Sequence, residues 1–337
     1  MEFNFLILFI FIGINLIFIY FFDNIKIFHQ NIDKPDSKRK IHKKPIPLAG
    51  GTIIFINIVF YFFLIFLSEG FLSNEILFKG NFELIIFFLS CSAIFALGFL
   101  DDRFNISASK KFLIISILIL LVLFLDDSLI INKVRFSFLS REFGLSYLSI
   151  IFTCFCFLVF LNSFNMFDGI NLQSCLYSIT IFTSILIFYS DLILIKVFLI
   201  CLIAYSYLNF KNKSFLGDSG SLLIPFVIGY IFIKLYNNDI IYYADEIVIF
   251  MLIPGLDLIR LFFKRILQKK NPLHPDKFHL HHLLISKFSH TRTLFMIMIL
   301  ILLPILFNFL SFQKIVIIII TSIIYTIIIK KISKKKL

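Results

Sequence analysis

Four aspartates beside long apolar stretches are the residues of this sequence best suited to chemistry. They are the adjacent pair Asp101 and Asp102, Asp168 after a polar stripe, and Asp218 in a glycine-rich loop. Carboxylates so close to apolar segments are costly and are functional candidates by default. Adjacent carboxylates also repel each other, and a divalent cation or a basic partner relieves that repulsion. The pattern predicts a site that holds a cation or a proton; the alternative is a helix end paired with Arg103, Lys110 or Lys111.

A stripe of polar residues leads to Asp168. Asn162, Asn165 and Asp168 recur every third residue, which places them on one face if the segment is helical. Gly169 directly after them can end the helix and let the backbone approach a ligand. Two amides and a carboxylate in this order favour a polar ligand or an ion, with hydrogen bonding between helices as the alternative.

The short loop at residues 217–221 reads Gly-Asp-Ser-Gly-Ser. Its glycines allow close backbone approach, its N–H groups can face a phosphate, and the Asp218 carboxylate can hold Mg²⁺. The loop begins a predicted helix, and helix N-termini favour anions. Many ordinary turns share this composition, so the loop alone does not decide a function.

Histidines cluster late in the chain. Five of the seven His fall between positions 274 and 290, including His279, His281 and His282. No Cys accompanies them and Asp276 is the one nearby acid, so the cluster disfavours a zinc site. We predict instead a patch that binds a diphosphate or a nucleotide.

A basic loop near the N-terminus carries Arg39 and His42, followed by Pro45, Pro47 and a pair of Gly. Its Lys and Arg fit an anchor of positive charge on the cytoplasmic side of a membrane. The two Pro and the paired Gly indicate a shaped turn in addition to that anchor.

The elements that must position these residues are membrane-spanning helices. Of the 337 residues, 60% are hydrophobic and only 15% charged, and the mean hydropathy is +0.99. These values exclude a soluble globular domain and a disordered chain. We predict an all-α polytopic membrane protein of about 11 transmembrane helices, forming a single integral-membrane domain over residues 1–337. The predicted spans cover residues 3–22, 50–67, 83–100, 112–125, 147–164, 171–189, 192–210, 222–236, 247–264, 293–310 and 313–329.

Basic residues set the predicted orientation. With the N-terminus outside and the C-terminus cytoplasmic, the inner loops and helix ends hold 25 of the 32 Lys and Arg, and the outer loops hold four. The positive-inside rule favours this orientation and accounts for the net charge of +12 without a nucleic acid partner. The four aspartates then lie at the cytoplasmic face, where we expect one shared cation-holding cavity. Acids of the outer loops, Asp126 and Asp245 among them, are interpreted as solvated loop residues.

Taken in order, these motifs resemble the polyprenyl-phosphate N-acetylhexosamine-1-phosphate transferase family, over nearly the whole chain. Five motifs carry the likeness: Arg39, His42, Pro45, Pro47, Gly50 and Gly51; Asp101 to Ser107 with Lys111; Asn162, Asn165, Asp168 and Gly169; Gly217 to Ser221; and Pro254 and Asp257 with His279, His281 and His282. One position departs from the pattern, because Leu48 stands where the family usually has Arg. Lys43 or Lys44 is the expected substitute for that basic contact.

The resemblance implies transfer of a sugar 1-phosphate from a UDP-sugar to a polyprenyl phosphate, with release of UMP, by an enzyme whose active site is formed by cytoplasmic loops. It implies catalytic roles for Asp101, Asp102 and Asp168, and Mg²⁺, or Mn²⁺ in its place, held by Asp218. The implied substrate-binding residues are Arg39, His42, Lys111, Asn165, Gly217, His279, His281 and His282. The implied partners are the UDP-sugar, the polyprenyl phosphate and the bilayer of the inner (plasma) membrane, with a homodimer left open.

We expect N-acetylglucosamine 1-phosphate as the transferred group and undecaprenyl phosphate as the acceptor, in the first membrane step of a cell-surface polysaccharide such as a lipopolysaccharide O-antigen. A phospho-N-acetylmuramoyl-pentapeptide transferase of peptidoglycan synthesis is the alternative, and its histidine motif differs from the HLHH of this chain. A transporter is the alternative of another class, because acids in membranes also mark ion paths. A catalytically inactive membrane scaffold is the third.

Overall fold

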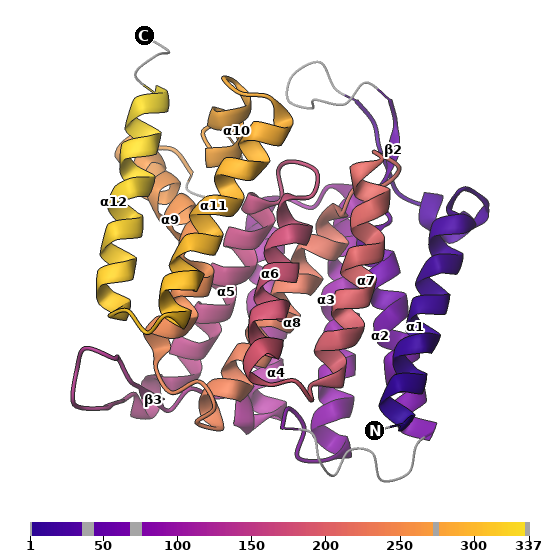
Figure 1. Cartoon of the computed structure of the whole chain (residues 1–337), viewed down its shortest axis with the longest axis horizontal. Helices are drawn as coiled ribbons and strands as arrows, with labels where there is room; N and C mark the ends of the chain where they lie inside the picture. Colours follow the sequence, from indigo (N-terminus) through magenta and orange to yellow (C-terminus); the bar gives the residue numbers. More distant parts are fainter. Residues whose placement is uncertain (1, 36–43, 68–75, 272–275, 334–337) are drawn as a thin grey trace. The chain divides into compact units, whose positions relative to one another are not determined.

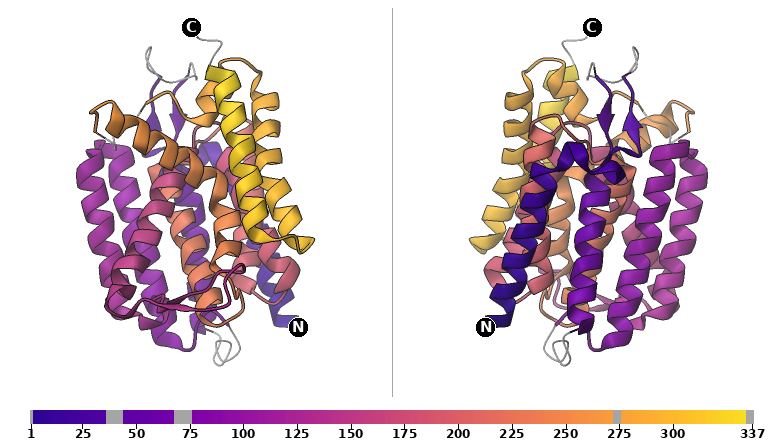
Figure 2. Two further views of the ribbon diagram at one scale, coloured as in Figure 1. Left: turned by 90° about the vertical axis from the view of Figure 1, so that its left-hand side faces the viewer. Right: turned by 90° about the vertical axis from the view of Figure 1, so that its right-hand side faces the viewer.

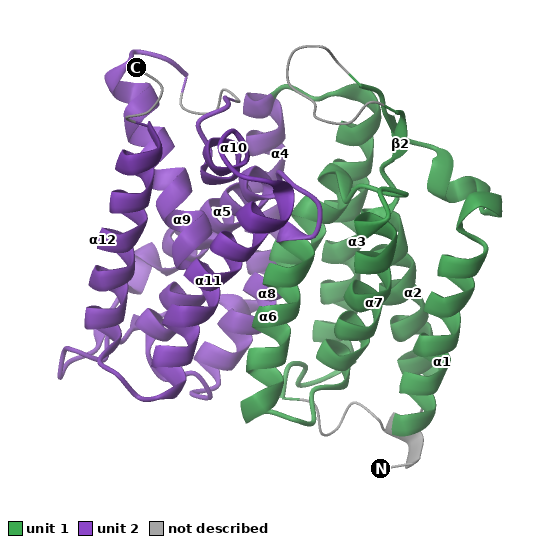
Figure 3. Cartoon of the chain, turned by 45° about the horizontal axis from the view of Figure 1, so that its top comes forward, with its two compact units in different colours: residues 1–107, 174–227 green, residues 108–173, 228–337 purple. Residues whose placement is uncertain are grey.

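The computed structural model describes residues 2–35, 44–67, 76–271 and 276–333. The described chain is mostly helical, and it divides into two compact units (Figure 3). Unit 1 comprises residues 1–107 and 174–227, and unit 2 comprises residues 108–173 and 228–337. The helix α8 (Gly217–Asn237) contributes its first half to unit 1 and its second half to unit 2.

Unit 1 is a set of long helices with one two-residue strand pair. It contains α1 (Glu2–Tyr20), β1 (Ile32–Asp33), β2 (Ile46–Pro47), α2 (Gly50–Leu67), α3 (Asn81–Phe104), α6 (Gln173–Phe188, from residue 174 onward) and α7 (Ile193–Phe210). The antiparallel strands pair Ile32 with Pro47 and Asp33 with Ile46. They stand at the end of this unit away from the N-terminus (Figures 1 and 2).

Unit 2 has the same construction. It contains α4 (Ala108–Leu125), β3 (Lys133–Val134), β4 (Phe143–Gly144), α5 (Ser149–Phe167), α9 (Ala244–Leu267), α10 (Leu280–Ile285), α11 (His290–Phe309) and α12 (Lys314–Ser333). α9 packs against α5, α11 and α12, and the short α10 packs against α11 and α12. Figure 1 shows α9, α11 and α12 running side by side, which brings distant parts of the sequence together at α10.

Each of the eleven apolar runs forms one long helix, namely α1 to α9, α11 and α12. Such helices are the expected structure in lipid, because they satisfy every backbone N–H and C=O within the segment. In the described residues, eight helices are long and apolar enough to cross a membrane, two further apolar helices are shorter, and α9 carries charges along its length. The predicted all-α polytopic membrane fold is therefore confirmed, whereas the orientation of the termini stays a prediction.

Buried polar contacts tie the helices of unit 1 together. Asn15 of α1 donates a hydrogen bond from its Nδ2 to the Asn57 Oδ1 of α2, at 2.7 Å, and both side chains are buried. Contacts of this type contribute ~0.6–2 kcal/mol each between helices in membranes. They fix the rotation of apolar helices whose faces are otherwise alike.

Two acids expected to be solvated are buried, so that interpretation is wrong for Asp126 and Asp245. Asp126 pairs with the buried Lys234 at 3.2 Å and accepts a hydrogen bond from the Tyr230 hydroxyl at 3.0 Å. Asp245 accepts hydrogen bonds from the backbone N–H and the hydroxyl of Ser137. Buried carboxylates persist where such partners replace water. These acids fasten the loops of unit 2 to α8 and α9.

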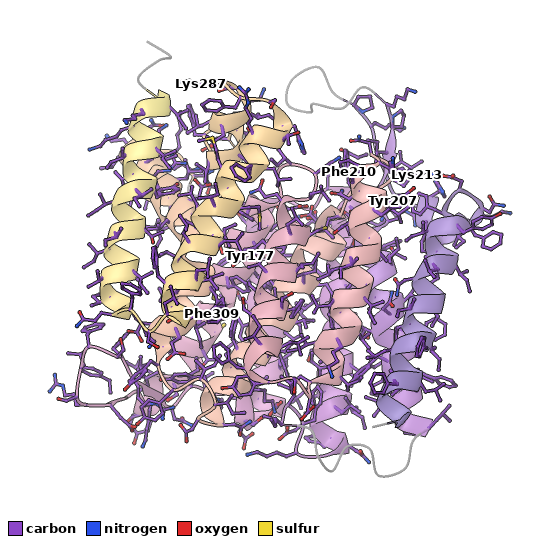
Figure 4. All side chains as sticks on the ribbon, viewed as in Figure 1. Tyr177, Tyr207, Phe210, Lys213, Lys287 and Phe309 are labelled. Carbon is purple, nitrogen blue, oxygen red and sulfur yellow. The ribbon has the colours of Figure 1, made fainter. Side chains whose placement is uncertain are left out.

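The end of α7 carries aromatic and basic side chains typical of a membrane–water interface. Figure 4 shows Tyr207, Phe210 and Lys213 gathered there, in the same part of unit 1 as β2. Tyr207 and Phe210 are exposed, and the Lys213 ammonium pairs with Asp23 at 2.7 Å. These aromatic rings and Lys213 indicate the position at which α7 would leave the hydrocarbon core of the membrane.

Candidate active site

In unit 1, a carboxylate at the end of α3 binds the start of α8. The backbone N–H of Asp218 donates to the Asp102 Oδ1 at 2.6 Å, and that of Ser219 donates to the Asp102 Oδ2 at 3.1 Å. The first N–H groups of a helix have no partner within it and carry partial positive charge, so a carboxylate is stabilised there. Asp102 thereby holds the Gly-Asp-Ser-Gly loop and brings Asp218 next to itself.

Helix backbones approach closely at this point because the contact residue on α3 is Gly98. A Cβ atom at Gly98 would lie 2.5 Å from the Ser219 Cα and 2.6 Å from the Asp218 carbonyl oxygen. Gly217 has φ +73°, a left-handed conformation that disfavours any side chain, and a Cβ there would lie 2.6 Å from the Asp102 Oδ2. The glycines thus determine how near the two aspartates come.

The first basic loop also fastens the Asp218 loop. The Phe215 N–H donates to the Pro47 carbonyl at 2.9 Å, and the Gly50 N–H donates to the Phe215 carbonyl at 3.1 Å. The Gly51 N–H continues this pattern to the Leu216 carbonyl at 3.0 Å. The segment after β2 therefore runs as a ladder beside residues 215–216. Arg39 and His42, predicted to bind substrate, lie outside the described residues.

Asp101 has different surroundings from Asp102. It is 4% exposed, and its Oδ1 accepts a hydrogen bond from the Ile106 N–H at 2.6 Å, just beyond the end of α3. The structure therefore brings Asp101, Asp102 and Asp218 to one end of unit 1. Lys111, which was predicted to bind substrate, belongs to unit 2, where it lies in the first turn of α4 and is half-buried.

The donor atoms at this end of unit 1 fit a hard cation. Asp102 and Asp218 repel each other electrostatically, and Asp218 is only half-buried. Among the residues that the structure describes, no three His, Cys, Asp or Glu side chains lie close enough together to hold a metal ion. Mg²⁺ is commonly held by one or two carboxylates, with water and substrate phosphates completing its shell. A pair of half-buried carboxylates suits that mode of binding.

In unit 2, the polar stripe of α5 meets the histidine cluster. Asn162 donates to the Leu158 carbonyl of its own helix at 2.7 Å, whereas Asn165 and Asp168 are half-buried at the helix end. A Cβ atom at Gly169 would lie 1.9 Å from the His281 Nε2, so the ring of His281 lies directly on the Gly169 backbone. The structure therefore brings the loop after Asp168 against the histidines.

Asp257 of α9 anchors the other side of this cluster. Its Oδ2 accepts a hydrogen bond from the His279 Nδ1 at 2.8 Å, and both side chains are buried. Its Oδ1 accepts from the Arg260 Nη2 at 2.8 Å and from the Tyr325 hydroxyl of α12 at 2.6 Å. Arg260 and Tyr325 are site residues that the sequence motifs did not predict. The spacing of Asp257 and Arg260, three residues apart on one helix, was an available signal, whereas a single Tyr in the apolar α12 gave none.

The three histidines differ in exposure. His281 is 3% exposed and His282 is half-buried, and their ring centroids are 4.2 Å apart. Burial, and then the neighbouring His282 and His279, lower the pKa of His281 well below its usual value. His281 is therefore neutral at physiological pH and packs against the loop after Asp168. His282, with its greater exposure, remains the more accessible of the pair.

Asp276 precedes the histidines on the polar side of this cluster. Burial by itself would raise its pKa, but hydrogen bonds from Arg265 and from the Phe278 N–H outweigh burial and lower it. The Arg265 Nε lies 2.8 Å from the Asp276 Oδ2. This ion pair holds the segment that leads into His279.

Comparisons with known proteins identify similar sequences. A family model described as glycosyl transferase family 4 matches residues 84–236. This middle segment of the chain is therefore similar to glycosyl transferase family 4. An undecaprenyl-phosphate alpha-N-acetylglucosaminyl 1-phosphate transferase of Thermotoga maritima is 27% identical over 289 residues, covering 84% of this chain and 81% of the relative. A protein of the same name from Escherichia coli K12 is 26% identical over 279 residues, covering 79% and 72%.

The segment similar to glycosyl transferase family 4 contains four of the site aspartates. Asp101, Asp102, Asp168 and Asp218 all lie between residues 84 and 236. Asp257 and the histidine cluster lie beyond it. The family match therefore covers the carboxylates of unit 1 and the end of α5, and the remaining site residues rest on the geometry of unit 2.

Proposed function

We propose that this protein transfers N-acetylglucosamine 1-phosphate from UDP-N-acetylglucosamine to undecaprenyl phosphate, with release of UMP. The observation that carries the proposal is the Asp102–Asp218 contact, at a helix start inside the segment matched by the family. Relatives with this named activity align over most of the chain. Both reactants are anions, so a site for them needs carboxylate-bound cations and basic groups together.

Asp218 is the proposed ligand of Mg²⁺, with Mn²⁺ as the alternative ion. Asp102 has both oxygens engaged by the N-terminus of α8, and the half-buried Asp218 lies beside it in the Gly-Asp-Ser-Gly loop. When bound, the cation would neutralise charge on the diphosphate of the donor. The N–H groups at the start of α8 add positive potential at the same place.

The other residues have proposed roles that follow their surroundings. Asp101 or Asp102 orients or deprotonates the acceptor phosphate, and Asp168 with Asn165 positions the nucleotide. Phosphate groups are proposed to bind at the basic and imidazole side chains, which are Lys111, His279, His281, His282 and, in the first loop, Arg39 and His42.

We propose that the reaction occurs on the cytoplasmic face of the inner membrane. The excess of Lys and Arg on one side supports that location, since UDP-sugars are cytoplasmic substrates and basic loops remain in the cytoplasm. The lipid product then begins a cell-surface polysaccharide, which we propose to be of the O-antigen type. A homodimer remains a proposal without a contact to support it.

A donor panel tests the proposed reaction. Membranes containing the protein receive undecaprenyl phosphate, Mg²⁺ and one UDP-sugar at a time, and UMP release is measured. We expect release with UDP-N-acetylglucosamine and loss of release when EDTA removes the cation. Release with the UDP-muramoyl-pentapeptide alone would establish the peptidoglycan reaction instead. Ion flux in liposomes without any UMP would establish a transporter.

A further inference from the structure

A buried hydrogen-bonded cluster in unit 2 joins three helices at one carboxylate. Asp257 is 4% exposed and accepts four hydrogen bonds, from the His279 Nδ1, the Leu280 N–H, the Arg260 Nη2 and the Tyr325 hydroxyl. These donors come from α9 itself, from the start of α10 and from α12. A buried carboxylate needs such partners to offset its lost hydration.

This arrangement fixes the state of the His279 ring. An ionised carboxylate can only accept hydrogen bonds, so the His279 Nδ1 facing Asp257 must carry a proton. The Nε2 atom on the far side of the ring is then the one that can contact a ligand. A carboxylate behind a histidine sets both its tautomer and its orientation in this way.

Tyr325 in turn sets the position of Asp257. Its hydroxyl donates to the Asp257 Oδ1 at 2.6 Å and accepts from the Arg260 Nε at 2.9 Å. Arg260 also reaches the Phe278 carbonyl at 2.6 Å, one residue before His279. Tyr325 is 2% exposed on a largely apolar helix, and a buried hydroxyl is costly without partners. The hydroxyl therefore lies between the two charged groups that hold the His279 segment.

We propose that Tyr325 is a positioning residue, which acts through Asp257 to hold the His279 ring with its Nε2 directed at the substrate phosphate. The identity of that phosphate rests on the proposed function, whereas the hydrogen-bonded cluster does not. The last helix of the chain, far beyond the segment matched by the family, is then part of the active site.

Tyr325→Phe tests this role because it removes one oxygen atom and leaves the ring in place. We expect kcat/KM to fall by roughly tenfold, since small errors in the orientation of a binding group are costly. In a His279→Asn background the same change should cause no further loss. The matched control is Thr326→Val, because Thr326 is exposed and its hydroxyl donates to the Ser322 carbonyl of its own helix. The cycle is measured in native membrane vesicles, so it does not require stability in detergent.

A second readout is independent of activity. In protein labelled with ¹⁵N-histidine, with His279→Asn assigning the signal, we expect Nδ1 of His279 to be protonated and its signal to move in Tyr325→Phe but not in Thr326→Val. An equal loss of kcat/KM in both backgrounds, or an unmoved His279 signal, would overturn the proposal. If the unaltered protein releases no UMP from any donor, the proposed function fails and the ¹⁵N signal alone decides the role of Tyr325.

Discussion

Two neighbouring aspartates at the end of α3 have separate roles. Successive side chains of a helix point about 100° apart, so adjacent carboxylates cannot easily share one partner. Asp102 turns to the start of α8, whereas Asp101 is bonded to the Ile106 N–H of its own connection. The sequence predicted a shared acidic site. The structure distinguishes a carboxylate that holds the Asp218 loop from one that holds the end of its own helix.

Replacement of Asp218 tests the proposed metal ligand. We expect Asp218→Ala to abolish UMP release, because the proposed carboxylate ligand of Mg²⁺ is lost. The protein should still insert, since the contacts to Asp102 come from the backbone N–H groups of residues 218 and 219. The measurement is UMP release over a range of Mg²⁺ concentrations, with a melting curve as the fold check. Asp191→Ala, at an exposed loop acid, is the control, and full turnover by Asp218→Ala would refute the assignment.

Acidification should destabilise the histidine cluster through His281. Its folded-state pKa is below its usual value because of burial, so the unfolded chain binds the proton more readily. The contribution of the neutral His281 ring to the free energy of unfolding is complete above about pH 6.5, the usual His pKa. This contribution decreases as the pH falls below that value. Asp276, whose pKa is lowered from an already acidic value, adds a similar loss only below about pH 4.

Melting temperatures between pH 8 and pH 5 check this expectation. His281→Gln should flatten the slope near pH 6, because the group that must protonate on unfolding is gone. His290→Gln, at an exposed histidine of α11, should keep the slope of the unaltered protein. Equal slopes for all three proteins would show that His281 does not contribute.

At the scale of elements, close helix packing decides where the aspartates meet. α3 reaches α8 at Gly98, and small residues of this kind let helix backbones approach closely within membranes. The ladder between the segment after β2 and residues 215–216 supports the same loop from the other side. The Asp218 loop is thus held by backbone contacts, which depend little on side-chain flexibility.

Gly98→Ala measures the importance of that approach. The added Cβ would meet the Ser219 backbone at 2.5 Å, and backbone cannot yield as a side-chain end can. We expect a destabilisation of roughly 1–3 kcal/mol, typical of overpacking, together with reduced UMP release. Gly13→Ala is the matched control, since nothing lies within 4 Å of a Cβ at that helical position in the described structure. A melting temperature of Gly98→Ala as high as that of this control would contradict the packing argument.

At the scale of the whole molecule, the distribution of charge makes its own prediction. The 25 to 4 division of Lys and Arg favours a cytoplasmic C-terminus and an external N-terminus. We expect a fluorescent protein fused to the C-terminus to fluoresce and alkaline phosphatase fused there to be inactive, because each reporter works on only one side. The opposite pair of results would reverse the orientation and place Asp218 at the outer face.

The amino-acid sequence alone was sufficient to predict the membrane class, the eleven helical runs and the resemblance to a transferase family. Runs of apolar residues as long as a bilayer have one stable structure, and the motifs need only their order along the chain to be recognised. The single domain over residues 1–337 stays a prediction, as does one cavity for all four aspartates, because Asp168 belongs to unit 2 and the other three to unit 1.

The pairing of polar groups across the molecule became visible only in the folded chain. Three contacts join residues more than sixty positions apart, and nothing in local composition connects them. They are Asp102 with the N-terminus of α8, Tyr325 with Asp257, and Lys234 with Asp126. Considered alone, each of these side chains is of a type that also occurs in solvated loops or at the membrane interface. The role of each side chain depends on whether a distant helix contacts it in an interior that excludes water. Packing determines that contact, and the sequence pattern does not.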